Sequence, residues 1–530
     1  MIPPSQTDPA AARRFGWRAK LSLFLLAPML LLGLAEGGLR LAGFRHAPRM
    51  KQLHFPTIAG YDGTYEYRLP TFPAPPGYLW RTQPDTPFTD ADGFRRPALP
   101  PHPAPDRIRI AFLGGSTTQG QRHPFAERTI DILNAALHAP RYEALNAGCS
   151  SYSSHQSLLA LRRWVLDRDP DLVCVYHGWN DGLVAPDGYS DAEKDRAASL
   201  PPFAARASRA LIAQSRLAQG LARAAEALDR SWPRPRVSPA EFERNLRAMA
   251  RLCARHPCDL VVFTRPPLAL HPLPPSEPAA HKACLAIQRR VAASENQVRL
   301  FDACAVVQSL HERLQAGEFG PGAQVHQPDG LHLRPLGEQL LAEQLALALA
   351  PEHAEAIRAW LDSPAYALST ARLLLDEIMP REAAWFLRRI PPESPARPEA
   401  EALLAEARRR FEFADHFWQG CWGGAAADFD SKIAHLRRCL EIRPDDLGVC
   451  RQLALVCFHM GRGGDAAALM EGFQPASPAA RYEGAVLAFR SHVAGRRLPE
   501  AVRAARLRLL LHPADSEARE FLRDAGCPTS

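Results

Sequence analysis

Five short apolar stretches between residues 107 and 302 each end at, or are directly followed by, a glycine or a polar residue. They cover residues 107–113, 142–147, 171–176, 259–264 and 298–302. Amphipathic stretches at 124–138 and 155–166 lie between the first three and favour helices. Strands that alternate with helices predict a parallel sheet covered on both faces. Ligands of such sheets bind beyond the carboxyl ends of the strands, so polar residues there are the first candidates for a site.

The rest of the chain divides by its pattern into segments of different character. We expect a basic N-terminal segment, a transmembrane helix, a proline-rich lead-in, an α/β domain with one insertion, and an all-α C-terminal domain. These segments cover residues 1–20, 21–44, 45–106, 107–350 with the insertion at 183–237, and 351–530.

The N-terminus has the pattern of a membrane anchor. Four basic residues precede residues 21–35, which carry no charge, and extension to residue 44 takes in Glu36 and Arg40. We therefore expect a single-pass signal anchor at 21–44, with residues 1–20 cytoplasmic and the remainder extracytoplasmic, in the periplasm. A cleaved signal peptide and a buried core helix are the alternatives.

The insertion at 183–237 contains an alanine- and arginine-rich stretch, 203–228, that favours a helix. A segment of this length beside a site can act as a lid over the substrate. It can equally pack on one edge of the domain, and the sequence leaves both interpretations open.

Beyond residue 350 the pattern becomes helical, with prolines that recur at a nearly constant interval. Pro444, Pro478 and Pro513 are 34 and 35 residues apart, and each follows an amphipathic stretch. This spacing resembles tetratricopeptide repeats, in which paired helices stack and commonly bind protein partners. A plain helical bundle is the alternative.

Composition narrows the function without identifying it. The chain has 530 residues, 46% hydrophobic and 23% charged, which is typical of a folded protein. Its net charge of +7 is spread along amphipathic stretches, so we expect no nucleic-acid partner. The eleven cysteines show no repeated CxxC spacing, and we expect neither a metal site nor a cofactor.

The first candidate for chemistry is Ser116, which follows a predicted strand and two glycines, Gly114 and Gly115. A serine in this position exposes its hydroxyl and its backbone N–H. The chain has neither the G-x-S-x-G elbow nor a P-loop lysine at this point, so the loop alone does not identify an activity.

Three further loops follow predicted strands and carry candidate groups. Gly148 comes after the second strand and Asn180 after the third, and each can offer an N–H donor. Asp329 and His332 come after the fifth strand. Across a turn, the carboxylate can orient the imidazole, which is then able to take a proton from a serine. Trp179 is expected to form a pocket wall, and His123, His155, His177 and His326 are interpreted as loop histidines rather than metal ligands.

Together, Ser116, Gly148, Asn180 and His332 resemble in order the four residues that name the SGNH hydrolases, or GDSL esterases. The resemblance covers about residues 107–348. It implies a flavodoxin-like three-layer sandwich with a five-stranded parallel sheet. It also implies roles: Ser116 is the nucleophile, and His332 is the base that Asp329 orients. The backbone N–H groups of Ser116 and Gly148 and the Asn180 amide form the oxyanion hole.

One position departs from the family pattern, because Gly115 stands where an aspartate usually precedes the serine. The segment 92–95, Asp-Gly-Phe-Arg, resembles the lead-in of membrane-anchored bacterial members. The expected function is a serine esterase acting on an acylated small molecule or glycan, for example by deacetylating a cell-surface glycan. An O-acyltransferase acting on a polysaccharide, and a non-catalytic scaffold that uses its repeats, are the alternatives.

Overall fold

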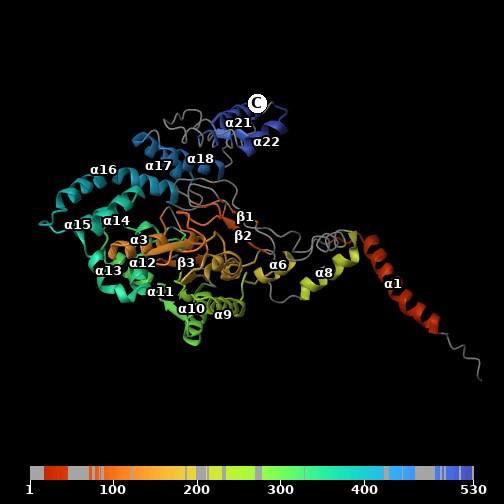
Figure 1. Ribbon diagram of the computed structural model, residues 1–530. Helices are drawn as coiled ribbons and strands as arrows, with labels where there is room; N and C mark the ends of the chain where they lie inside the picture. The colour runs from red at the N-terminus through yellow and green to blue at the C-terminus, as the bar shows by residue number, and fades with distance from the viewer. Residues whose placement is uncertain are drawn as a thin grey trace, which may run out of the picture. The chain divides into compact units, whose positions relative to one another are not determined.

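The computed structural model is drawn in Figure 1. It describes residues 17–45, 71–73, 78–82, 84, 89–120, 123–185, 188–198, 211, 214–228, 234–268, 277–320, 322–327, 329–422, 429–443, 446–459, 484–486, 488–489, 492–493, 497–511 and 515–527.

A five-stranded parallel sheet forms the centre of the α/β part. Its strands are β3 (Ile108–Gly114), β4 (Tyr142–Asn146), β5 (Leu172–Tyr176), β6 (Asp259–Phe263) and β7 (Val298–Phe301). They lie in the order β4-β3-β5-β6-β7. The first strand of this sheet in sequence, β3, therefore lies inside it. The chain passes from β3 to β4 on one side, and then to β5, β6 and β7 on the other side. This reversal opens a crevice beyond the carboxyl ends of β3, β4 and β5.

Alternating side chains of the strands face two layers of helices. Ile110 and Phe112 of β3 share a hydrophobic core with helices α3 (Phe125–Ala136) and α12 (Pro335–Leu349). The intervening residue Ala111 is also fully buried, so both faces of the strand are covered. Helices α4, α9 and α10 contact one another in sequence and pack on β3, β6 and β7. These three helices cover Ser154–Ala160, Pro239–Arg255 and Glu277–Ser294, and α11 covers Ala303–Gln315.

The sheet and its parallel topology confirm the α/β fold that the sequence predicts, and each of the five predicted strands is present. The first predicted helix corresponds to α3, and the second to α4 continued by a π turn over Leu161–Val165. The lead-in contains a feature that the sequence does not predict, an antiparallel pair of short strands. These are β1 (Thr71–Pro73) and β2 (Trp80–Thr82).

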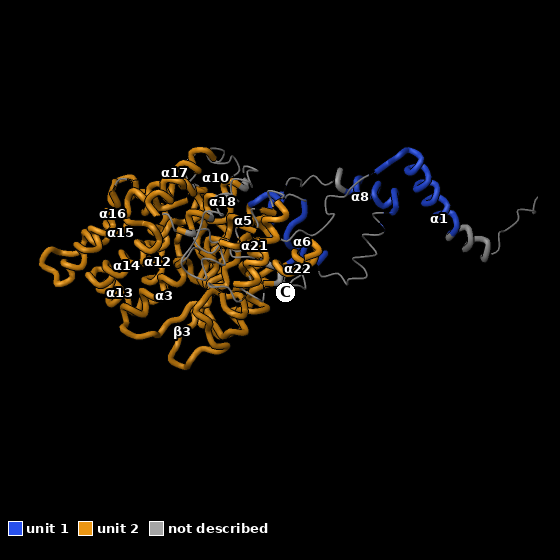
Figure 2. Tube along the Cα trace, turned by 90° about the horizontal axis from the view of Figure 1, so that it is seen from above, with its two compact units in different colours: residues 1–55, 74–78, 183–236 blue, residues 56–73, 79–182, 237–530 orange. Residues whose placement is uncertain are grey.

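Residues 1–55, 74–78 and 183–236 form a compact unit of their own, coloured blue in Figure 2. Its helices are α1 (Trp17–Leu41), α6 (Asp191–Ala198) and α8 (Arg216–Leu228). No helix among the described residues is both long enough and sufficiently apolar to cross a bilayer. The transmembrane helix expected at 21–44 is therefore not found. The charges of Glu36 and Arg40 lie inside α1 and interrupt its apolar run.

The C-terminal region is helical, as the sequence predicts, and consecutive helices from α14 to α18 pack against one another. Among the described residues, the helices are α13 (Ala354–Leu361), α14 (Pro364–Asp376), α15 (Pro380–Arg388), α16 (Arg397–Trp422), α17 (Phe429–Ile442), α18 (Leu447–His459), α21 (Leu498–Leu511) and α22 (Ser516–Asp524). The three periodic prolines lie outside the described residues. The 34-residue repeat therefore stays a prediction.

Buried polar groups join α3 to α12 and to the end of α14. The guanidinium of Arg128 donates to Gln339 at 2.8 Å and is paired with the buried Glu377. The backbone N–H of Phe125 donates to the carboxyl of Glu338 at 2.7 Å. Because α12 directly follows the loop that carries His332, these bonds fix the helix that positions that loop.

Glu338 makes the stability of the protein depend on pH in a direction that can be tested. Burial raises the pKa of Glu338 from 4.5 to about 8, although the charge of Arg128 and the N–H of Phe125 oppose the shift. A carboxyl with a raised folded-state pKa takes up a proton on folding. Its stabilising contribution is complete below about pH 4.5 and is lost as the pH rises through 8.

We therefore expect Glu338→Gln to become progressively more stable than the wild type between pH 5 and 8. The difference should grow by up to about 1.4 kcal/mol per pH unit, the value for one proton. Urea unfolding at several pH values measures it. Glu312→Gln, at an exposed glutamate of α11, is the matched control and should leave the slope unchanged. A constant difference between Glu338→Gln and the wild type would contradict the assignment.

Candidate active site

Ser116 lies at the point where the sheet order reverses. Strand β3 ends at Gly114, and Ser116 is the first residue of the short helix α2 (Ser116–Gln119). A side chain at Gly115 would place its Cβ 2.6 Å from Nδ2 of Asn180. The absence of a side chain at Gly115 thus lets the Asn180 amide lie directly beside the serine loop. In this chain the Asn180 amide thus occupies the space that a side chain at Gly115 would need.

Asp329 and His332 belong to a tight loop between α11 and α12. The loop is closed by backbone hydrogen bonds from Gln327 to His332 and from Arg334 to Val325, both at 2.8 Å. One oxygen of the Asp329 carboxylate accepts the backbone N–H groups of Leu331 and His332 at 2.9 and 3.0 Å. The carboxylate therefore shapes the turn that presents the imidazole.

The structure brings Ser116, His332 and Asp329 into one continuous hydrogen-bonded chain. Nε2 of His332 is 2.7 Å from Oγ of Ser116, and Nδ1 is 2.5 Å from Oδ2 of Asp329. Residues that are 216 positions apart in sequence are thus in direct contact. Both distances are within hydrogen-bonding range, and each ring nitrogen has one partner.

Electrostatics keep Asp329 ionised in this arrangement. Burial raises the pKa of Asp329, but the hydrogen bond and charge of His332, together with two backbone N–H groups, outweigh it. The net pKa is below the ordinary value of 3.8. An ionised carboxylate at Nδ1 favours the tautomer that leaves Nε2 able to accept a proton.

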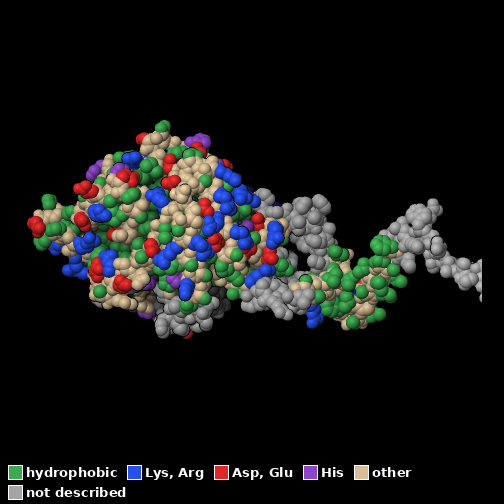
Figure 3. Space-filling model, turned by 90° about the horizontal axis from the view of Figure 1, so that it is seen from below, with side chains coloured by type: hydrophobic (Ala, Val, Ile, Leu, Met, Phe, Trp, Pro, Cys, Tyr) green, Lys and Arg blue, Asp and Glu red, His purple; other side chains and the backbone are tan. Residues whose placement is uncertain are grey.

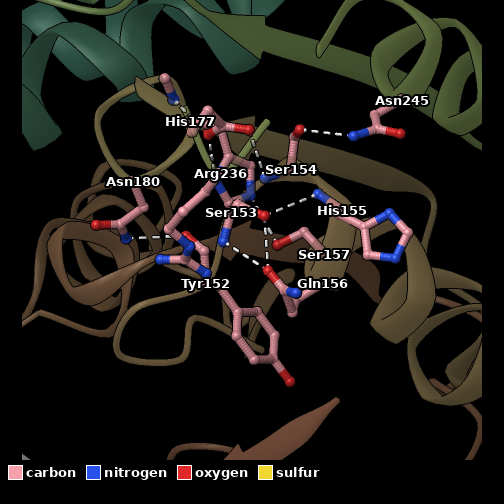
Figure 4. Close-up of polar contacts among 12 residues, drawn as sticks. Tyr152, Ser153, Ser154, His155, Gln156, Ser157, His177, Asn180, Arg236 and Asn245 are labelled. Carbon is pink, nitrogen blue, oxygen red and sulfur yellow. Dashed lines mark hydrogen bonds and ion pairs between the residues drawn. The ribbon is translucent and has the colours of Figure 1, made fainter. Parts of the chain in front are cut away.

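Asn180 comes from α5 (Trp179–Gly182), the helical turn after β5. Its Nδ2 donates to the backbone oxygen of Tyr152 at 2.9 Å, as Figure 4 shows. This bond uses one of the two amide hydrogens and fixes the orientation of the amide. The second hydrogen is left for an acceptor near Ser116.

Gly148 is placed close to the serine loop, but its N–H is already used. It donates to Oδ1 of Asn146 at 3.0 Å, while Nδ2 of Asn146 donates to the carbonyl oxygen of Thr118 at 3.0 Å. A side chain at Gly148 would overlap the backbone of Thr118 and Gln119. Gly148 thus permits close packing of α2. Its N–H, which the sequence assigns to the oxyanion hole, contacts the side chain of Asn146 in this structure.

A small, partly open pocket of about 220 Å³ lies beside the serine. Its lining comes from residues 115–117 around the serine, from the end of β5, from α5, and from the loop that carries Asp329 and His332. The lining residues are Gly115, Ser116, Thr117, Tyr176, His177, Gly178, Trp179, Asn180 and Leu331. Trp179 therefore forms part of the wall, as the sequence predicts, and its ring meets Tyr176 edge to face at 4.9 Å. Gly148 is not part of this lining.

The remaining candidate histidines have other partners. Nε2 of His177 is 2.7 Å from Oγ of Ser157, and His123 pairs with Asp131 at 2.8 Å. His326 lies in the same loop as Asp329 and His332, and its Nδ1 is 2.9 Å from Nε2 of His311 in α11. In the part of the chain that the structure describes, no cluster of three or more histidine, cysteine or acidic residues has the arrangement of a metal site.

Residues 112–340 match the family model described as GDSL-like Lipase/Acylhydrolase family. Among solved structures, the chain is similar to an acetyl xylan esterase, with 17% identity, a TM-score of 0.32, and coverage of 46% of this chain and 100% of that one.

Two further solved structures give similar values. A lipase/acylhydrolase from Enterococcus faecalis has 19% identity and a TM-score of 0.28, with 46% of this chain and 96% of that one covered. A putative GDSL-like lipase from Parabacteroides merdae has 14% identity and a TM-score of 0.31, with 47% and 97% covered. A search of curated proteins found no match.

The family match covers the serine loop, the asparagine after β5 and the Asp329–His332 loop within one segment. Residues 112–340 therefore form a GDSL-type hydrolase domain, and the protein is an enzyme that hydrolyses ester bonds.

Proposed function

We propose that the protein is a serine esterase that removes short acyl groups, acetyl above all, from a glycan through an acyl-serine intermediate. The observation that carries this proposal is the hydrogen-bonded chain from Oγ of Ser116 through His332 to Asp329. A serine hydroxyl is a weak nucleophile until an adjacent base can take its proton, and Nε2 of His332 occupies the position of that base.

The reaction proceeds in two half-reactions. Oγ of Ser116 attacks the ester carbonyl while Nε2 of His332 takes its proton, and the resulting imidazolium is stabilised by Asp329. The imidazolium then protonates the leaving alcohol, and the carbon–oxygen bond to that alcohol breaks. In the second half, His332 takes a proton from a water molecule, which attacks the acyl carbon. The bond from that carbon to Oγ of Ser116 breaks, His332 returns the proton to Oγ, and the acid is released.

The negative charge of the tetrahedral intermediate needs donors that are already in place. The side-chain amide of Asn180 and the N–H of Ser116 at the start of α2 supply them in this proposal. The N–H of Gly148 can contribute only if it leaves Asn146. We therefore assign the larger share of the stabilisation to Asn180.

The size of the pocket supports a short acyl group. Its volume is about 220 Å³ even with the space that is open to solvent included, so only a small group fits beside Ser116. Tyr176, Trp179 and Leu331 form part of its wall, and the rings of Tyr176 and Trp179 pack edge to face against each other. The side chains of His332 and Asp329 are 29% and 43% exposed. This exposure leaves room for a bulky alcohol outside the pocket, as in a glycan chain.

Ser116→Ala should abolish hydrolysis of para-nitrophenyl acetate, with a loss of at least about 10³-fold, because no other group can form the acyl-enzyme. Labelling by a fluorophosphonate probe should disappear with it. Thr117→Ala, at the neighbouring residue of the same pocket, should retain labelling. Labelling that persists in a folded Ser116→Ala variant would assign the nucleophile to a different residue.

Asn180→Ala should lower kcat by about 10²–10³-fold, the usual loss for one oxyanion donor, with a small effect on KM. Steady-state kinetics with para-nitrophenyl acetate measure this. Asn245→Ala is the matched control: its side-chain amide donates to Oγ of Ser154 at 2.9 Å, and Asn245 is not part of the pocket lining (Figure 4). Equal kinetic losses in the two variants would attribute the effect of Asn180 to packing.

The acyl-chain preference tests the proposed substrate class. Activity should fall steadily from the para-nitrophenyl ester of acetate through butyrate to octanoate, and Trp179→Ala should extend the range toward longer chains. Measurement of kcat/KM for the three esters decides this. A wild-type enzyme that prefers octanoate would contradict the short-acyl proposal while leaving the assignment of Ser116 intact.

A further inference from the structure

Helix α1 exposes large apolar side chains in every direction. Six of them, between residues 24 and 32, are 55% to 75% exposed: Phe24, Leu26, Met29, Leu30, Leu31 and Leu32. At 100° per residue, their directions around the helix axis leave no gap wider than about 100°. The described central part of α1 therefore has no polar side that could face water.

This all-round distribution favours lipid over a protein partner. A helix that packs on a protein surface needs one apolar stripe and keeps a polar face for solvent, whereas a helix surrounded by hydrocarbon is apolar on all sides. Residues 24–34 rise by about 15 Å, which is roughly half of the ~30 Å hydrocarbon core of a bilayer. The exposed section is thus long enough to enter that core.

Helix α8 of the insertion is attached to the end of this apolar section by Glu36. The Glu36 carboxylate accepts the backbone N–H groups of Leu217 and Arg216 at 2.6 and 3.0 Å, and the hydroxyl of Ser215 at 2.9 Å. It thereby satisfies N–H groups that the first turn of α8 leaves without intrahelical partners. The backbone N–H of Leu217, followed by that of Arg216, lowers the pKa of Glu36 to about 2.

Basic side chains gather at the same junction. Arg40 pairs with Glu36 at 2.7 Å and also donates to the backbone oxygen of Gln214 at 2.6 Å. The guanidinium of Arg223 lies 5.8 Å from the centre of the Phe44 ring. Figure 2 shows α1 and α8 side by side, and Figure 3 shows hydrophobic side chains gathered over them.

We propose that α1 and α8 form one lipid-binding unit, in which α1 inserts into a bilayer and α8 lies at its anionic headgroup surface. The arginines of the junction then face lipid phosphates, and Leu211 and Leu221, each more than 60% exposed, face the boundary of the acyl chains. The insertion at 183–237 is accordingly a membrane-docking element. This assignment differs from both interpretations of the insertion that the sequence allows.

Flotation of the full-length protein with vesicles tests the proposal. The protein should float with phosphatidylcholine vesicles that contain one quarter phosphatidylglycerol. The double variant Leu30→Glu/Leu31→Glu should lose at least about tenfold in vesicle binding, because two charges cannot enter hydrocarbon. Leu507→Glu/Leu510→Glu, at exposed leucines of α21, is the matched control and should float like the wild type. Circular dichroism establishes that each variant is folded.

Two further variants test the part assigned to α8. Arg216→Glu/Arg223→Glu should weaken binding to the anionic vesicles several-fold more than binding to pure phosphatidylcholine. Glu36→Gln should weaken binding to both, because α8 loses the carboxylate that holds its N-terminus. Unchanged binding of both variants would contradict the placement of α8 at the headgroup surface.

The proposal is overturned if the wild type and Leu30→Glu/Leu31→Glu float equally well. It is also overturned if the wild type does not float and instead forms a dimer that the same double variant disrupts, because a second copy then covers α1. Hydrolysis of para-nitrophenyl acetate is a separate readout. Its loss in Ser116→Ala leaves vesicle binding unchanged, so failure of the lipid proposal and failure of the esterase proposal are distinguishable.

Discussion

The chemistry of this protein depends on the contact between Ser116 and His332. This contact requires that two parts of the fold far apart in sequence, β3 and α12, hold the two side chains within hydrogen-bonding distance. Ser116 is fixed by β3, an inner strand whose neighbours β4 and β5 hold it on both sides. His332 is fixed by α12, which packs on α3. A shift of about 1 Å between the sheet and α12 would break the 2.7 Å bond between Oγ and Nε2. Two sets of buried bonds oppose such a shift. Glu338 of α12 accepts the N–H of Phe125 in α3, and Arg128 of α3 is bonded to Gln339 and Glu377.

Close packing around the serine loop explains why the site tolerates so few side chains. Gly115 makes room for the Asn180 amide, and Gly148 makes room for the backbone of α2. Gly178 has a φ of +130°, a backbone conformation that residues other than glycine rarely adopt. A Cβ atom at this position would lie 2.6 Å from the side chain of the buried Arg265. Each of these glycines places the backbone of one loop against a side chain or the backbone of another. The hydroxyl, the imidazole and the amide can therefore converge on a small volume.

The sequence predicts the parts of this structure that depend on local pattern. Short apolar runs that end at a glycine or a polar residue locate the five strands, and their parallel order places Ser116, Asn180 and His332 at one edge of the sheet. The sequence does not predict how the N–H of Gly148 is used, because the orientation of Asn146 is set by Thr118 and by Glu127 of α3. Nor does it predict that Asn180 is held by the carbonyl of Tyr152, which lies 28 residues earlier. Such contacts depend on how separate helices, strands and loops pack together. The spacing of hydrophobic residues along the chain contains no information about this packing.

The helical C-terminal region is joined to the hydrolase part by a shared core. One hydrophobic cluster runs from Ile110 of β3 through α12 to Ala407 of α16 without a break at residue 350. The guanidinium of Arg128, in the α/β part, is paired with Glu377, in the helical part, and both are buried. Removal of one member of a buried pair leaves a charge without compensation, which costs about 3–5 kcal/mol. Helices α13 to α15 are thus part of the structure that supports the site, whereas α17 and α18 pack with the end of α16 in a separate cluster.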